Sequence, residues 1–139
     1  MSDAVRFPYL SIIESKRPTD LMPYLPLQLA RHNKSKNVLG LVDSGASINV
    51  LPYQTGIDLG AVLEDQLPLF GLSGNLADYE AKGLILTASV ANFSPVELAF
   101  GWTKADNIPV ILGQVNFFNE FKVCFLRFQD EFEISKNEQ

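Results

Sequence analysis

The chain has 139 residues, 47% hydrophobic and 19% charged, which suits one domain with a substantial core and is short for two. Its 11 Lys and Arg residues against 16 Asp and Glu residues give a formal net charge of −5, and no basic cluster stands out. This charge pattern argues against a nucleic acid or an anionic membrane as partner. The single cysteine, Cys124, excludes an internal disulfide, and the N-terminus lacks the pattern of a secretion signal. We therefore expect one soluble, cytoplasmic domain over residues 1–139, with no membrane span.

Alternating apolar residues predict strands in the first third of the chain. The predicted elements are a strand at 7–13, a polar loop at 14–20, a strand at 24–30, a solvated turn at 31–37 and a strand at 38–42. Pro8 confines the first strand to an edge or a bulge. Leu25, Leu27 and Leu29 alternate with Pro26 and Gln28, as expected for a half-buried strand. Residues 38–42 are an unbroken apolar run, which predicts a strand buried on both faces.

Short strands continue to the C-terminus. The predicted elements are a strand at 48–51, a helical turn within 53–60, a hairpin of strands at 67–72 and 76–90, strands at 96–102 and 109–113, a helix at 114–120, and strands at 121–128 and 131–135. On the long arm of the hairpin, Leu84, Leu86, Ala88 and Val90 share one face. Roughly nine strands with one or two short helices predict an all-β fold, a small closed or partly closed β-barrel with one short C-terminal helix.

The apolar run at 38–42 leads directly into Asp43, Ser44 and Gly45. A carboxylate placed at the end of a buried strand is costly unless it is hydrogen-bonded or paired. We therefore expect Asp43 to have a chemical purpose, as one half of a catalytic pair. Taken alone, these three residues would equally suit a plain turn in which the aspartate caps its own backbone.

Three motifs, in this order, resemble those of the retropepsin-like aspartic proteases. Residues 41–47, Leu-Val-Asp-Ser-Gly-Ala-Ser, are similar to the active-site signature of that family, and residues 70–74, Phe-Gly-Leu-Ser-Gly, resemble the tip of its flap. Residues 110–113, Val-Ile-Leu-Gly, resemble the apolar pair and glycine before its C-terminal helix. The resemblance spans about 24–128 and implies the barrel of the retropepsin-like acid proteases. Residues 1–22 are then an N-terminal extension or extra strand, and 129–139 a C-terminal hairpin or tail.

The resemblance implies an aspartic endopeptidase that uses neither metal nor cofactor. In such an enzyme one carboxylate activates a water, and a second, protonated carboxyl donates to the peptide carbonyl oxygen. Two neighbouring carboxyls share one proton and titrate as a coupled pair. The chain carries one Asp-Ser-Gly segment, so the second Asp43 must come from another copy in a two-fold homodimer.

The implied site combines a catalytic turn, a flap and pocket walls. Ser44 would hydrogen-bond across the two-fold axis, and Gly45 would let the backbone approach the substrate. The full set is catalytic Asp43, Ser44 and Gly45, with substrate-binding Ala46, Ser47, Gly71, Leu72, Ser73, Gly74, Ile108, Val110 and Ile111. Retroviral members carry an arginine that braces the dimer at the position of Gln114, so this residue departs from the pattern.

Two other functions remain open. The first is a catalytically silent retropepsin-like dimer that serves as a peptide-binding or scaffold module, and the second is a small β-barrel with an unrelated role. The carboxylate of Asp43 favours the enzyme, because a binding module has no need to retain it. His32 is expected in an exposed turn, where one histidine makes a metal site improbable. Cys124 lies between Val123 and Phe125 in a strand pattern and is expected to be a core thiol.

Overall fold

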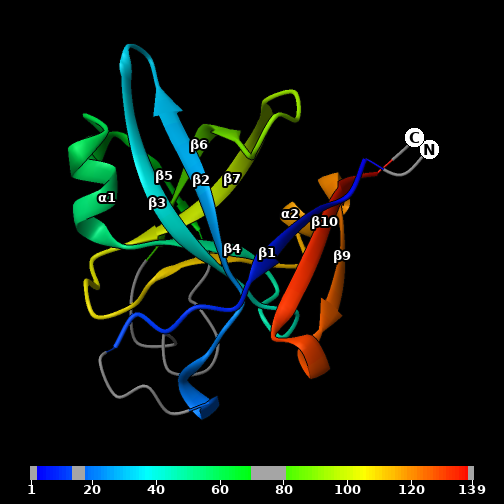
Figure 1. The fold of residues 1–139 in the computed structure, drawn as a ribbon. Helices are drawn as coiled ribbons and strands as arrows, with labels where there is room; N and C mark the ends of the chain where they lie inside the picture. Colours follow the sequence, from blue (N-terminus) through cyan, green and yellow to red (C-terminus); the bar gives the residue numbers. More distant parts are fainter. Residues whose placement is uncertain (1–2, 14–17, 70–80, 138–139) are drawn as a thin grey trace.

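The structure is a computed structural model that describes residues 3–13, 18–69 and 81–137 (Figure 1). Its strands are β1 (Val5–Pro8), β2 (Tyr24–Arg31), β3 (Lys34–Val42), β4 (Asn49–Leu51), β5 (Leu67–Leu69), β6 (Ala81–Ser89), β7 (Val96–Thr103), β8 (Val110–Leu112), β9 (Phe121–Leu126) and β10 (Glu131–Lys136). The helices are α1 (Tyr53–Asp58) and α2 (Phe117–Glu120), with 3₁₀ turns at η1 (Pro18–Asp20), η2 (Leu63–Asp65) and η4 (Arg127–Gln129). None of the described helices is long and apolar enough to cross a membrane.

Six of these strands close into a barrel. The strand order is β2-β3-β8-β4-β7-β6, and β2 also pairs with β6, so the first and last strands of this series meet. The β3–β8 and β4–β7 pairs are parallel, and the other pairs of the ring are antiparallel. Strand β5 pairs with the first residues of β6, on the edge of β6 that β2 joins further along. The prediction of a small closed β-barrel is therefore confirmed.

Period-two alternation fills the inside of this barrel. Leu25, Leu27 and Leu29 of β2 are buried while Pro26 and Gln28 between them are exposed, as the sequence predicts. The same holds for β6, where Leu84, Leu86 and Ala88 are buried and Ile85 is 63% exposed. Inward-facing side chains of a barrel this narrow pack against one another and leave no channel.

The run at 38–42 is not buried on both faces, so that prediction is wrong. Gly40 and Val42 face the interior and are buried, whereas Leu41 is partly buried and Leu39 is 39% exposed. A barrel strand has an inner and an outer face, and the described residues leave the outer face of β3 partly exposed. Strand β3 also begins earlier than expected, at Lys34, and pairs with β2 along its whole length.

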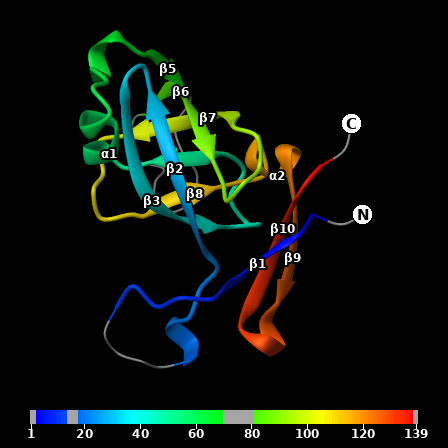
Figure 2. The ribbon, with the colours of Figure 1, turned by 45° about the horizontal axis from the view of Figure 1, so that its top comes forward.

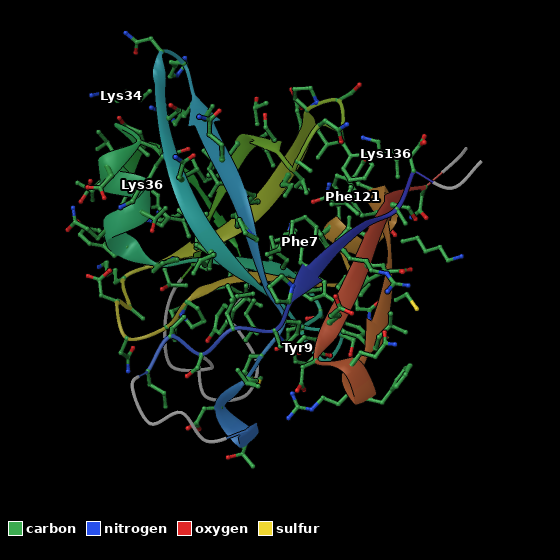
Figure 3. The ribbon with its side chains drawn as sticks, in the orientation of Figure 1. Phe7, Tyr9, Lys34, Lys36, Phe121 and Lys136 are labelled. Carbon is green, nitrogen blue, oxygen red and sulfur yellow. The ribbon has the colours of Figure 1, made fainter. Side chains whose placement is uncertain are left out.

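The two ends of the chain form a second, three-stranded antiparallel sheet beside the barrel, in the order β1-β10-β9 (Figure 2). We call it the terminal sheet. Phe132 and Ile134 of β10 are fully buried, and the ring of Phe132 lies 5.5 Å from that of Phe7 and 6.0 Å from that of Tyr9. Figure 3 shows Phe7 on β1 and Tyr9 just beyond its end. The opposite face is polar, and there Arg6 donates to Glu133 at 2.6 Å.

Three local predictions at this end of the molecule need correction. The first strand is Val5–Pro8 rather than 7–13, because proline has no N–H to extend a ladder, and Leu10 then makes only an isolated bridge to Met22. The C-terminal helix begins at Phe117 rather than at 114. Cys124 is exposed, because it lies on the polar face of β9 opposite Glu133.

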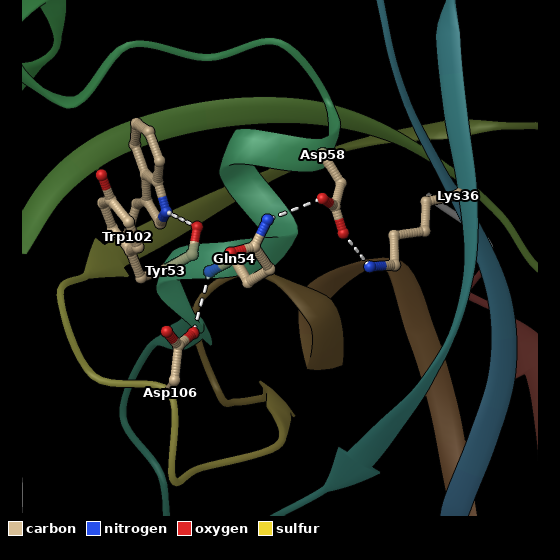
Figure 4. Close-up of polar contacts among 6 residues, drawn as sticks. All are labelled: Lys36, Tyr53, Gln54, Asp58, Trp102 and Asp106. Carbon is tan, nitrogen blue, oxygen red and sulfur yellow. Dashed lines mark hydrogen bonds and ion pairs between the residues drawn. The ribbon is translucent and has the colours of Figure 1, made fainter.

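The helical turn predicted within 53–60 is confirmed as α1, which packs on the outside of the barrel (Figure 4). The indole N–H of Trp102 donates to the carbonyl of Tyr53 at 3.1 Å, and the backbone N–H of Gln54 donates to Asp106 at 2.9 Å. Asp58 at the end of α1 accepts a hydrogen bond from Lys36 of β3. This contact lowers the pKa of Asp58 below its ordinary value.

Candidate active site

Asp43 follows β3 directly, and its position is set by the parallel pairing of β3 with β8. Leu41 lies opposite Ile111 and Val42 opposite Leu112, so the two apolar runs that the sequence singled out lie side by side. The backbone N–H of Asp43 then donates to the carbonyl of Leu112 at 3.0 Å. The ladder of the barrel therefore continues to the first residue of the turn at residues 43–47. Because the sequence predicts a catalytic role for this turn, we name it the catalytic turn.

The catalytic turn folds back on the carboxylate of Asp43. The backbone N–H of Gly45 donates to Asp43 Oδ1 at 2.9 Å, and the N–H of Ala46 donates to the carbonyl of Asp43 at 3.1 Å. A Cβ atom at Gly45 would lie only 3.3 Å from Asp43 Oδ1, tighter than an ordinary contact. In this single protomer Asp43 is partly buried, rather than in the dry environment expected from sequence, and Ser44, Gly45 and Ser47 are exposed.

The segment after β8 runs alongside the catalytic turn and binds it at three points. The N–H groups of Gln114 and Val115 donate to the carbonyls of Ala46 and Ser47, both at 2.9 Å. The side-chain amide of Gln114 donates to the carbonyl of Ser44 at 2.8 Å. Val115 also forms an isolated parallel β-bridge with Ile48, so this segment is still paired like a strand and α2 begins only at Phe117.

Gly113 is the residue that allows this close approach. A Cβ atom there would lie 2.4 Å from the carbonyl oxygen of Ile48 and 2.8 Å from that of Ala46, closer than real Cβ contacts come. Both neighbours are backbone atoms, which cannot rotate away as a flexible side chain can. The glycine of the Val-Ile-Leu-Gly motif is therefore required by packing against the catalytic turn.

A buried asparagine fixes the far side of this arrangement. Asn49 is fully buried, and its Oδ1 accepts the N–H of Gly113 at 2.8 Å. Its Nδ2 donates to the carbonyl of Ala99 at 3.0 Å and to Oδ1 of Asn116 at 3.1 Å. The sequence analysis did not single out Asn49 or Asn116; the available signal was one polar residue inside the apolar strand that follows the turn.

An apolar cluster separate from the main core lies next to the catalytic turn. Val50 and Ala81 are buried in it, and Ile48, Ile108 and Ile111 are partly buried against them. The structure thus brings together Ile108 and Ile111, two of the three residues expected to form pocket walls. The third, Val110, faces the barrel interior and belongs to the main core.

The remaining expected site residues are distributed as follows. Gly71, Leu72, Ser73 and Gly74, the expected flap tip, lie outside the described residues, although β5 and β6 pair on either side of them as the predicted hairpin requires. His32 is exposed in the β2–β3 turn with a φ of 55°. Across the described ranges, no group of three His, Cys, Asp or Glu side chains is placed to hold a metal ion.

No protein-family model and no curated protein sequence matches this chain. Solved structures do match. A retropepsin-like aspartic protease from Rickettsia conorii aligns with a TM-score of 0.70 and 14% identity, over 98% of this chain and 94% of that one. The chain has the retropepsin-like fold.

Two further structures align over the same 73% share of this chain at 17% identity. The EIAV protease in complex with the inhibitor HBY-793 gives a TM-score of 0.53 and is covered over 86% of its length. The retroviral protease-like domain of Ddi1 from Leishmania major gives 0.55 and is covered over 79%. The resemblance read from three short motifs is thus confirmed at the level of the fold, while the assignment of Asp43, Ser44 and Gly45 as catalytic stays a prediction.

Proposed function

We propose that this protein is an aspartic endopeptidase. The observation that carries the proposal is the place of Asp43, at the head of a tightly bonded Asp-Ser-Gly turn at the end of a barrel strand of the retropepsin-like fold. The backbone N–H of Gly45 donates to one carboxylate oxygen of Asp43 at 2.9 Å and so restrains the group within its own turn. A carboxylate held in this way suits general acid–base work on a water.

The proposed active species is a two-fold homodimer. One protomer supplies one Asp43, and hydrolysis by this route needs a second carboxyl to protonate the peptide carbonyl oxygen. Two copies of the turn meeting at the axis would supply the pair, with Ser44 of each copy exposed and available to the other. Leu39 and Leu41 are partly exposed on the outer face of β3, the strand that ends at this turn.

The proposed substrate is an extended peptide of a protein. Such a peptide docks in an extended conformation. Ala46 and Ser47, whose carbonyls are already bonded to the N–H groups of Gln114 and Val115, would line the cleft beside it. The cluster of Ile48, Ile108 and Ile111 beside the turn would accept apolar side chains of the peptide. A hairpin tip at residues 71–74 would close over it and exclude water.

The test is peptide cleavage measured against pH for the wild-type protein and Asp43→Asn. We expect wild-type cleavage that a hydroxyl-bearing transition-state mimic inhibits, and a loss of at least about a thousandfold in Asp43→Asn, because the amide can neither activate water nor share a proton. Asp106→Asn, at an exposed carboxylate beside α1, is the matched control and should cleave normally.

The same experiment separates the enzyme from a binding module. A scaffold with this fold would bind the peptide mimic equally well as wild type and as Asp43→Asn, without cleavage by either. Sedimentation at high concentration tests the homodimer: a strict monomer that cleaves peptides would contradict the paired mechanism, since one chain holds one such aspartate.

A further inference from the structure

Gln114 stands out because it donates to two carbonyls of the catalytic turn, those of Ser44 and Ala46, the residues on either side of Gly45. Its side-chain Nε2 donates to the carbonyl of Ser44 at 2.8 Å, and its backbone N–H donates to the carbonyl of Ala46 at 2.9 Å. Gln114 is exposed to solvent. Its side chain is nevertheless held against the catalytic turn by the hydrogen bond to Ser44. Both bonds lie within one protomer.

The backbone bond and the side-chain bond do different work. The bond to Ala46 belongs to a ladder that also includes Val115 and Ser47, so it would persist with any residue at position 114. The bond to Ser44 depends on the glutamine amide alone. It fixes the Ser44 carbonyl, which belongs to the same peptide unit as the N–H of Gly45, the group that donates to Asp43 Oδ1 at 2.9 Å.

A peptide unit is planar and rigid, so fixing its carbonyl oxygen fixes the direction of its N–H as well. The chain of contacts therefore runs from the Gln114 amide through one peptide plane to the carboxylate of Asp43. A reacting group gains rate from being held in its working orientation before the substrate arrives.

We propose that Gln114 is a positioning residue of the active site, which orients the Asp43 carboxylate through the Ser44–Gly45 peptide before any partner binds. The inference rests on the proposed function for its effect on cleavage. Its structural part, the orientation of the Gly45 N–H, does not depend on catalysis. Dimerisation then has to supply the second carboxyl, while each protomer has already shaped its own turn.

The first test compares Gln114→Met with the wild type. Methionine keeps the length of the side chain and removes the donor, so kcat should fall about tenfold, the equivalent of one lost hydrogen bond, while KM stays within about twofold. The matched control is Gln54→Met, which removes the hydrogen bond that the Gln54 side-chain amide donates to Asp58 on α1. This variant should leave kcat unchanged. An unchanged kcat in Gln114→Met would overturn the proposal.

The second test uses Gln114→Glu, which has nearly the shape of the wild type. A protonated carboxyl can donate to the Ser44 carbonyl and an ionised one cannot. Because glutamate titrates near pH 4.3, kcat of this variant relative to wild type should recover as the pH falls from about 6 towards about 4. A ratio that stays flat with pH would show that the donor is not what matters. The pH dependence is measured on one variant, so a general loss of stability in that variant does not by itself produce the expected recovery.

The third test does not need activity. Amide hydrogen exchange of Gly45 should be about tenfold faster in Gln114→Met, while amides of the β6–β7 pair keep the wild-type rate. If the wild-type protein fails to cleave peptides but this exchange is accelerated, the proposed function fails and the positioning role stands. If cleavage is normal and exchange is unaltered, the reverse holds.

Discussion

The barrel and the terminal sheet differ in how far apart along the chain their pairing partners lie. Both regions contain hairpins, such as β2–β3 in the barrel and β9–β10 in the terminal sheet. Their distant pairs differ, because the barrel sets Gly40 opposite Val110 and the terminal sheet sets Val5 opposite Ile134. Yet both regions contribute to one continuous core, in which Trp102 and Phe100 of the barrel and Phe121 and Phe132 of the terminal sheet are buried. The terminal sheet therefore packs on the barrel through a shared apolar core, while the described strands of the two sheets do not pair with each other.

The largest expected effect comes from breaking that packing. Phe132→Ala removes a fully buried ring that contacts Phe7 and Tyr9, and we expect the free energy of unfolding to fall by about 3–5 kcal/mol. Urea denaturation followed by fluorescence and by circular dichroism should still give one coincident transition. The control is Phe128→Ala, whose ring is 82% exposed and whose loss should be nearly neutral. Two separate transitions would mean that the terminal sheet folds independently of the barrel.

An intermediate effect is expected at the contact between the catalytic turn and the segment after β8. Gly113→Ala places a Cβ against the carbonyl oxygens of Ile48 and Ala46, which should cost about 1–3 kcal/mol of unfolding free energy and also lower the cleavage rate. The measurement is urea denaturation together with the peptide assay. A free energy of unfolding within about 0.5 kcal/mol of wild type would contradict this, because it would mean that the turn can accommodate a methyl group at position 113.

The smallest effects are expected at the surface ion pairs, one in each region. Asp58 pairs with Lys36 on the barrel and Glu133 with Arg6 on the terminal sheet. The pKa of Asp58 is lowered in the folded protein, chiefly by the Lys36 hydrogen bond, so the stability it contributes is present above the unfolded-state pKa and is lost as the pH falls through the folded-state pKa. Lys36→Met should therefore lower stability slightly at neutral pH and have no effect in strong acid.

Urea denaturation of Lys36→Met and of Arg6→Met, each at neutral pH and near pH 2, measures this difference. Both variants should lose less stability than either buried substitution, and the loss should shrink in about 1 M salt, where charges are screened over about 3 Å. A loss in Lys36→Met that is as large in strong acid as at neutral pH would contradict the electrostatic explanation.

The features that could be predicted from sequence are those with a local physical cause. Alternation located β2 and β6, because an inward and an outward face require it. The Asp-Ser-Gly segment and the Val-Ile-Leu-Gly segment were recognisable because each places chemistry-bearing or small residues directly after an apolar run. Their contact across the β3–β8 pair was not predicted, and the structure supplies its bonds.

The features that could not be predicted depend on contacts between distant residues. The pairing of β1 with β10 leaves no mark on either segment alone, since each reads as a short amphipathic strand. Leu39 was taken as buried because hydrophobicity does not say which face of a strand is covered. Gln114 appeared only as a departure from a family pattern, and its bond to Ser44 requires the turn to be folded before it exists.

The antiparallel pairing of β1 with β10 has a consequence for how the chain can be connected. It sets the beginning of β1 beside the end of β10, with Val5 opposite Ile134, so that the described chain traces a nearly closed loop in space. A short peptide link across this point would join the two ends without crossing the barrel. The chain could then be reopened at the exposed His32 turn with every strand pair retained. Circularly permuted genes of this domain are thus compatible with the same fold.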